Sequence, residues 1–192
     1  MTLAILALQG AFAEHQQMLR SIGVDSLLIR NLEDWNRYLA FHQHDGQFQH
    51  AGLILPGGES TTMMRILRDE QLLDPIREAI RQGLPTFGTC AGMILLDDQH
   101  LDVMDITVLR NAYGRQLGSF YTEHECQPLG IIPMTFIRAP YIQRAGQDVQ
   151  ILSVLEGHII AARQGHILAT SFHPELNDTP SLHRFFIEQM VR

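Results

Sequence analysis

The stretch that decides the fold is LPTFGTCAGMILL, residues 84–96. Its first part, residues 84–87, predicts a short strand, and residues 91–96 predict the first turns of an apolar helix. Between them stands Cys90, with a glycine two residues away on either side, which is the spacing of a nucleophile elbow with cysteine in place of serine. Such a sharp turn needs small neighbours, because bulk would collide with the adjoining backbone. A thiol at the start of a helix is also placed where its nucleophilic thiolate form is favoured.

A lone cysteine is more often a buried, inert residue, so the function of Cys90 depends on whether the chain supplies partners. The run SFHPE, residues 171–175, stands at the end of the last predicted strand. Residues two apart on an extended segment point to the same side, and Pro174 favours an extended backbone at His173. We therefore expect His173 and Glu175 beside Cys90, as a base and as the carboxylate that orients this base.

A third motif, PGGES at residues 56–60, ends a predicted strand and begins a helix. Its glycines allow backbone N–H groups to approach a ligand closely. The N–H of Gly58 and that of Ala91, directly after the nucleophile, are predicted to form an oxyanion hole. The alternative is a plain turn in which Ser60 caps the following helix. A phosphate loop is not indicated, because the Gly-Lys-Ser/Thr ending of such loops is missing.

The first half of the chain alternates strand and helix patterns, with strands predicted at 3–8, 26–29, 52–55 and 85–87 and helices at 12–22, 60–67 and 72–80. This alternation is typical of an α/β fold with a mostly parallel central sheet and helices on both faces. The second half predicts strands at 106–109, 119–125, 134–137, 149–155, 159–163 and 167–171. We expect these strands to form an antiparallel extension of the sheet. An amphipathic helix is predicted over 181–191.

Composition indicates one globular domain over residues 1–192, since 45% of the residues are hydrophobic and 18% are charged. The net charge of −7 argues against a nucleic-acid-binding protein. Two cysteines, Cys90 and Cys126, are too few for a disulfide scaffold or a cysteine-based zinc site. The pattern of a signal peptide is missing, and no apolar run approaches the roughly 20 residues that cross a bilayer. We therefore expect a cytoplasmic protein without membrane contact.

The remaining histidines lack a comparable setting. The run FHQHDGQFQH, residues 41–50, is expected to be a solvated loop, because no carboxylate or cysteine spacing completes a metal site around His42 and His44. The other histidines are expected at the surface, among them His15, His100, His124 and His183. No metal or cofactor site is predicted.

Taken together, PGGES, GTCAG and SFHPE, in this order, resemble the class I (triad) glutamine amidotransferases, whose fold is flavodoxin-like. The runs RNAYGRQ at residues 110–116 and FIRAP at 136–140, with the opening Leu8-Gln9-Gly10, are similar to the glutaminase subunit of pyridoxal 5'-phosphate synthase. This likeness covers essentially the whole chain. Two departures stand out: Ile94 replaces the glutamine of many class I members, and residues 36–50 form a longer stretch than expected.

The resemblance implies hydrolysis of L-glutamine to glutamate and ammonia through a thioester on Cys90, with His173 as the base and Glu175 as its orienting partner. It also implies which residues line the glutamine pocket, namely Gly58, Glu59, Ser60, Arg110, Ile137 and Arg138. The α-carboxylate of glutamine needs a cation, and arginine binds carboxylates through two parallel hydrogen bonds. The sequence leaves open which arginine does so.

The same resemblance implies a partner. The ammonia would pass to a (β/α)8-barrel synthase subunit, which builds pyridoxal 5'-phosphate from a pentose phosphate and a triose phosphate. In this family, twelve glutaminase subunits decorate a core of twelve synthase subunits.

Three other functions stay open on the motifs of the triad alone. A glutaminase that serves histidine or purine biosynthesis is one, although RNAYGRQ and FIRAP argue against it. A stand-alone γ-glutamyl hydrolase is the second, and it should act without a partner on extended substrates. A binding module that keeps the fold without the chemistry is the third, and the intact set of Cys90, His173 and Glu175 argues against it.

Overall fold

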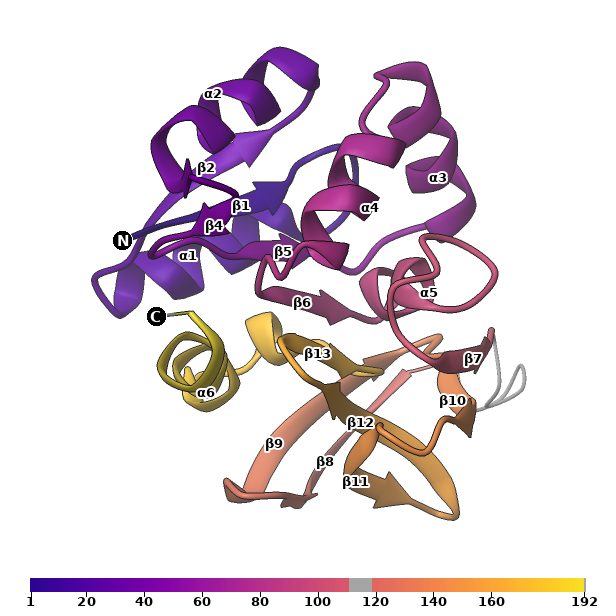
Figure 1. Cartoon of the computed structure of the whole chain (residues 1–192). Helices are drawn as coiled ribbons and strands as arrows, with labels where there is room; N and C mark the ends of the chain where they lie inside the picture. The colour runs from indigo at the N-terminus through magenta and orange to yellow at the C-terminus, as the bar shows by residue number, and fades with distance from the viewer. Residues whose placement is uncertain (111–118, 192) are drawn as a thin grey trace.

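A computed structural model describes residues 1–110 and 119–191 of the chain. The strands of its central sheet are β1 (Thr2–Leu6), β2 (Asp25–Ile29), β5 (Leu53–Leu55), β6 (Thr86–Thr89), β7 (Ile106–Leu109), β10 (Tyr141–Ala145), β11 (Gln150–Leu155), β12 (His158–Gln164) and β13 (Ile167–Thr170). Within the described residues this sheet has nine strands in the order β2-β1-β5-β6-β13-β12-β10-β7, with β11 paired to β12 (Figure 1).

The strands β2, β1, β5, β6 and β13 pair in parallel, as the alternating pattern predicted. Both faces of the inner strands are buried because each face is covered. Along β1, for example, Ala4 and Leu6 join one hydrophobic cluster, and Leu3 and Ile5 join the other. This is the side-chain alternation of a strand buried between two layers.

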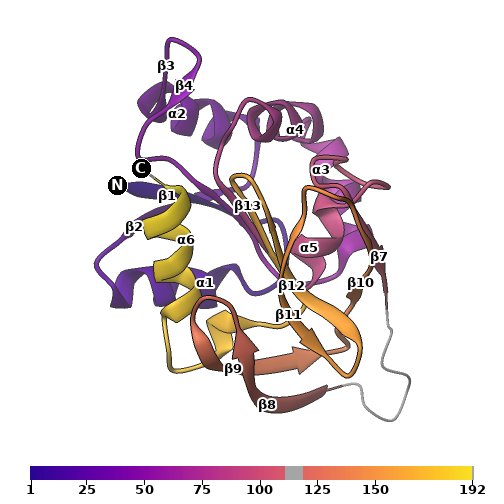
Figure 2. The same cartoon turned by 60° about the horizontal axis from the view of Figure 1, so that its bottom comes forward.

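Helices cover both faces of the sheet, as predicted (Figures 1 and 2). One face carries α2 (Leu32–His42), α3 (Ser60–Asp69), α4 (Leu73–Arg81) and α5 (Ala91–Leu96), and the other carries α1 (Phe12–Ser21) and α6 (Ser181–Met190). A single 3₁₀ turn, η1 (Pro174–Leu176), precedes α6. None of the helices in the described part of the chain is long and apolar enough to cross a membrane.

The antiparallel extension is confirmed in part. β12 runs antiparallel to β13, β11 and β10 run antiparallel to β12, and β7 runs antiparallel to β10. The strands β8 (Ser119–Cys126) and β9 (Gly130–Ile137), however, form a two-stranded sheet of their own, so their predicted place in the central sheet is wrong. Alternate side chains of this ribbon, among them Cys126, Met134 and Phe136, pack into the same hydrophobic cluster as α6. The ribbon therefore covers the sheet instead of extending it.

The run 41–50 is solvated, as expected, but it is not a plain loop. It begins inside α2, which the sequence analysis missed, and continues as a hairpin of β3 (Gln43–His44) and β4 (Gln47–Phe48). Asp45 and Gly46 make the turn with φ of +49° and +76°, as an Asp-Gly pair does in tight hairpins.

Four neighbouring parallel strands, β1, β5, β6 and β13, bring their carboxyl ends to one edge of the sheet. The segments that follow them carry Gln9, the PGGES loop, Cys90 and His173. In open α/β sheets this edge is where ligands bind. The fold therefore places the three sequence motifs side by side.

Candidate active site

Cys90 stands at the sharp turn between β6 and α5. Its backbone has φ +49° and ψ −104°, a conformation that a cysteine rarely adopts. The N–H of Cys90 donates to the carbonyl of Thr170 at 2.8 Å, which ties the turn to the end of β13. The predicted strand, sharp turn and helix around the nucleophile are therefore confirmed.

Gly88 and Gly92 show why the neighbours of the elbow are small. A Cβ on Gly88 would lie 2.7 Å from the carbonyl oxygen of Gly92, and a Cβ on Gly92 would lie 1.9 Å from the carbonyl oxygen of Leu55. Both obstacles are backbone atoms of the elbow and of β5. Glycine is therefore required at both positions for the turn to pack against the sheet.

His173 lies directly after β13 and is largely buried. Its Nδ1 donates to Oε1 of Glu175 at 2.7 Å. Burial alone opposes a charge on the ring, but the hydrogen bonds and charges of Cys90 and Glu175 outweigh it and raise the pKa of His173 to about 10. The site thus favours a proton on His173, which is where a general base holds the proton that it takes from a thiol.

Glu175 lies in η1, behind His173, and its side chain is buried. Burial favours the protonated carboxyl, but His15 and His173 outweigh this effect and hold the pKa of Glu175 below its usual value. Glu175 is therefore a carboxylate that can orient His173 and stabilise its positive charge.

The PGGES loop packs directly against this pair. A Cβ on Gly57 would lie 2.3 Å from Cε1 of His173 and 3.3 Å from Cβ of Cys90. Only a glycine lets the backbone of the loop come this close to the imidazole. The helix that follows is capped by Glu59, whose carboxylate accepts from the N–H groups of Thr61 and Thr62, so the alternative that gave this cap to Ser60 is wrong.

A cavity of about 330 Å³ opens beside Cys90. Its wall brings together every residue expected at the substrate and in the oxyanion hole, together with the expected nucleophile and base: Gly58, Glu59, Ser60, Cys90, Ala91, Arg110, Ile137, Arg138 and His173. Glu175 contacts this set from behind, through His173. Sequence positions that are more than 100 residues apart thus meet in one pocket.

Gln9 is a pocket residue that the site prediction missed. Its side-chain oxygen accepts from the N–H of Glu59 at 2.7 Å, and the N–H of Ala11 donates to the carbonyl of Gly57 at 3.0 Å. The segment after β1 therefore braces the PGGES loop. Gln9 belongs to the opening Leu8-Gln9-Gly10 run, but nothing in the spacing of that run indicates a contact with a loop 50 residues away.

The two arginines of the pocket differ in their partners. Arg110 lies 3.1 Å from the carboxylate of Glu59 and also donates to the hydroxyl of Thr61 at 3.1 Å. Hydrogen bonds, chiefly from Thr62 and then from Thr61, hold the pKa of Glu59 at about 2, so this carboxylate is charged. Arg138, by contrast, makes no ion pair with any described residue, and its backbone has a φ of +44°. The remaining residues of the RNAYGRQ run, 111–116, lie outside the described part of the chain.

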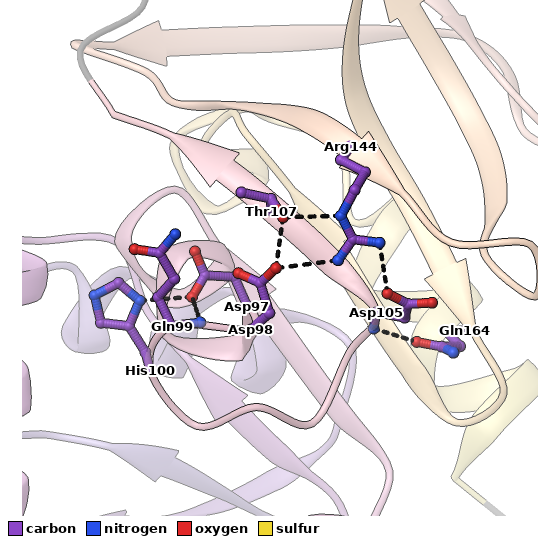
Figure 3. Close-up of polar contacts among 8 residues, drawn as sticks. All are labelled: Asp97, Asp98, Gln99, His100, Asp105, Thr107, Arg144 and Gln164. Carbon is purple, nitrogen blue, oxygen red and sulfur yellow. Dashed lines mark hydrogen bonds and ion pairs between the residues drawn. The ribbon is translucent and has the colours of Figure 1, made fainter.

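Both arginines stand at the same end of the β7–β10 pair, because Arg110 follows β7, Arg138 precedes β10, and Leu109 pairs with Tyr141. Further along the pair, Arg144 of β10 donates to Asp98, Asp105 and Thr107 (Figure 3). Figure 3 also shows Asp105 joined to Gln164, at the end of β12. This polar cluster ties the arginine-bearing strands to the segment after α5 and to the sheet.

Two histidines expected at the surface are buried instead. His15 of α1 and His183 of α6 have no exposed surface, so this expectation is wrong for both. Their rings contact each other, and His15 reaches Glu175. The hydrophobic periodicity of α1 and α6 does not indicate that these histidines are buried, because a histidine fits either side of an amphipathic helix.

Sequence comparison assigns the family. The sequence model of the SNO glutamine amidotransferase family matches residues 5–192. This chain belongs to that family. The likeness that the five motifs indicated is thereby confirmed, and the protein is an enzyme, a glutamine amidotransferase.

The similar proteins agree with this assignment. The pyridoxal 5'-phosphate synthase subunit PdxT of Streptococcus pneumoniae strain CGSP14 is 56% identical over 195 residues, which cover 98% of this chain and 96% of that protein. A crystal structure of a glutamine amidotransferase superposes with a TM-score of 0.84 at 38% identity and covers 97% of both chains. The structure of PurLQS from Thermotoga maritima shares the fold alone, with a TM-score of 0.69 at 14% identity over 97% of both chains.

Proposed function

We propose that this amidotransferase is the glutaminase subunit of a pyridoxal 5'-phosphate synthase and works through a triad of Cys90, His173 and Glu175. The observation that carries the proposal is the meeting of Cys90, the His173–Glu175 pair and the PGGES loop around one cavity. The 56% identity to a synthase subunit over nearly the whole chain supports the pathway. The proposed unit of function is residues 1–192, as one domain.

The reaction begins with transfer of the thiol proton of Cys90 to Nε2 of His173, whose Nδ1–H is held by Glu175. The sulfur attacks the side-chain amide carbon of glutamine and forms a tetrahedral oxyanion. The backbone N–H groups of Gly58 and Ala91, both in the cavity wall, are the proposed donors to this oxyanion. His173 then gives its proton to the departing nitrogen, which leaves as ammonia, and a thioester remains on Cys90.

The second half of the reaction releases glutamate. A water molecule gives a proton to His173 and attacks the thioester carbon. The tetrahedral intermediate collapses, the sulfur of Cys90 leaves, and its proton returns from His173. Two proton transfers in each half thus use the same imidazole, so a fixed His173–Glu175 pair serves both.

The α-amino and α-carboxylate groups of glutamine are recognised by the part of the cavity wall that holds Arg110 and Arg138. Of the two arginines there, Arg138 is free of ion pairs with the described residues, whereas Arg110 is held by Glu59. We assign the α-carboxylate to Arg138, since its guanidinium needs to break no existing ion pair. The buried hydroxyl of Ser60 has no hydrogen-bond partner among the described residues and offers the substrate a further polar contact.

The partner in this proposal is a (β/α)8-barrel synthase subunit that receives the ammonia, in an assembly of twelve copies of each subunit. Cys90 and Cys126 are both free thiols, as suits the reducing cytoplasm in which the proposal places the complex.

A glutaminase assay with and without the synthase subunit tests the proposal. Ammonia release from glutamine should be low for the chain alone and should rise when the synthase subunit is added in equal amount. Size-exclusion chromatography with light scattering measures the complex that forms. Full activity alone, unchanged by the synthase subunit, would contradict the partnership and favour a stand-alone hydrolase.

A further inference from the structure

Two buried histidines, His15 and His183, lie outside the proposed triad. His15 projects from α1 and His183 from α6, two helices that lie together on one face of the sheet (Figure 2). Nδ1 of His15 is 2.9 Å from Nε2 of His183. On its other side, Nε2 of His15 is 3.1 Å from the hydroxyl of Thr89 and 3.4 Å from Oε2 of Glu175. The pair thus extends from α6 to the triad.

The contact with Glu175 falls on the oxygen that the triad leaves unused. Oε1 of Glu175 accepts from His173, whereas Oε2 is buried, forms no hydrogen bond with the described residues and has Nε2 of His15 as a neighbour at 3.4 Å. A buried carboxylate oxygen without a donor is costly. His15 is therefore the group placed to satisfy it.

The positions of the protons follow from the contacts. A carboxylate oxygen accepts only, so Nε2 of His15 must carry the hydrogen if the contact is to be attractive. Nδ1 of His15 then accepts from Nε2–H of His183, and Nδ1 of His183 is a bare lone pair. That atom is buried without a partner, and a buried lone pair without a partner is tolerated better than a buried N–H.

The opposite set of protons fails on both counts. It would turn a lone pair of His15 toward the carboxylate, with only the hydroxyl of Thr89 able to donate to it, and leave an N–H of His183 buried with no acceptor among the described residues. The two rings cannot both be protonated, because two imidazolium ions at 2.9 Å would repel. Burial provides for this, since it lowers the pKa of His15 and that of His183.

We propose that His15 is a positioning residue for the glutaminase reaction, which fixes the Glu175 carboxylate by its second oxygen, and that His183 sets the tautomer of His15 that can do so. This inference rests on the proposed triad. The outer torsion of a glutamate is soft, so a carboxylate held by one oxygen can rotate. Held by both oxygens, Glu175 keeps Oε1 aimed at His173 while the imidazole gains and loses its proton in each half-reaction.

The test compares two substitutions of His15 in the complex with the synthase subunit. His15→Gln keeps an N–H donor close to the position of Nε2, whereas His15→Leu keeps the volume and removes the donor. For His15→Leu we expect kcat to fall roughly 10- to 100-fold, the effect typical of removing a partner that orients a functional side chain, with KM within about twofold of the wild type. His15→Gln should recover most of kcat.

A matched control separates positioning from stability. Leu19 lies on the same helix and is fully buried, but it lies away from the triad, so Leu19→Ala should lower Tm and leave kcat unchanged. If His15→Leu does not fold, His183→Leu and His183→Gln carry the same comparison through the tautomer of His15. Equal kcat for the Leu and Gln variants at the residue tested would overturn the inference.

An error in the proposed triad gives a different result from an error in the role of His15. If Cys90→Ala keeps glutaminase activity, the mechanism itself is wrong, whatever the His15 variants do. If Cys90→Ala is inactive while His15→Leu has wild-type kcat, the triad stands and the positioning role of His15 falls.

Discussion

The parallel and the antiparallel halves of the sheet build the candidate site in different ways. The ends of β1, β5, β6 and β13 supply the proposed reacting groups, and buried strands and close backbone contacts hold these groups. The ends of β7 and β10 supply the two arginines, and an exposed cluster of charged side chains holds those strands. The parallel half is thus fixed by backbone packing, the antiparallel half by side-chain polar contacts.

This difference has a physical consequence. A backbone atom about 2 Å from a new Cβ cannot move aside without distorting the strand or loop that it belongs to. Loss of an exposed ion pair, by contrast, lowers the free energy of unfolding by only about 0–1 kcal/mol. Substitutions that disturb the packing of the parallel half should therefore lower kcat strongly. Substitutions in the antiparallel half should weaken substrate binding, which raises KM, and should change kcat much less. Substitutions in each half test this difference.

The largest effect is expected at the nucleophile in the parallel half. Cys90→Ala removes the sulfur of the proposed thioester, and we expect kcat to fall by roughly 10⁴–10⁶, as for other nucleophiles of catalytic triads. Glutaminase activity of the complex is the measurement. Cys126→Ala is the matched control, because it removes the other buried thiol, in β8, outside the cavity wall. An active Cys90→Ala or an inactive Cys126→Ala would contradict the assignment.

A smaller but large effect is expected from one added methyl group. Gly57→Ala places a Cβ 2.3 Å from Cε1 of His173, so the imidazole or the loop must move. We expect kcat to fall about 100-fold, since a shift of about 1 Å in a reacting group costs that much. Gly165→Ala is the control: it adds the same methyl in a turn with open space at φ +55° and should cost about 1–2 kcal/mol of stability without changing kcat. Equal kcat in the two variants would mean that the packing around His173 is not tight.

The two halves also differ in how much of each could be predicted from the sequence. The parallel strands, the elbow at Cys90 and the His173–Glu175 pair follow from short motifs, because each depends on neighbours within a few residues. Pairing of β8 with β9 depends on what their apolar sides pack against, and alternation alone does not reveal this. β10 escaped notice because only Ile142 within it is fully buried, so its pattern lacks a continuous apolar run.

Helix α2 was missed although it carries local signals. Asn31 caps it by accepting from the N–H of Asp34, and Trp35 and Tyr38 lie three residues apart on its buried side. The many polar residues in this segment hid that narrow apolar stripe. The burial of His15 and His183 was beyond local reasoning, because the two rings are 168 residues apart in the chain and satisfy each other only in the fold.

In the antiparallel half, the first test is the proposed carboxylate-binding arginine. Arg138→Ala removes a guanidinium that faces the cavity without an ion pair to any described residue. We expect KM for glutamine to rise roughly 10- to 100-fold, the equivalent of one hydrogen-bonded charge contact, while kcat falls much less. Steady-state kinetics of the complex measure both. Arg163→Ala, on β12 and outside the cavity wall, is the control for loss of a positive charge.

The smallest effect is expected where the polar cluster holds the arginine-bearing strands. Arg144→Ala removes the side chain that bridges Asp98 and Asp105 (Figure 3), and the ends of β7 and β10 should then hold Arg110 and Arg138 less firmly. We expect KM to rise about two- to fivefold with unchanged kcat, because exposed ion pairs contribute little and are screened by salt. The decisive measurement is KM at low and at high salt. Salt should raise KM more in the wild type than in Arg144→Ala, and Arg81→Ala, which breaks the separate surface pair with Asp102, should respond to salt as the wild type does. A large loss of kcat in Arg144→Ala would show instead that the antiparallel half also fixes the reacting groups, and the contrast between the two halves would not hold.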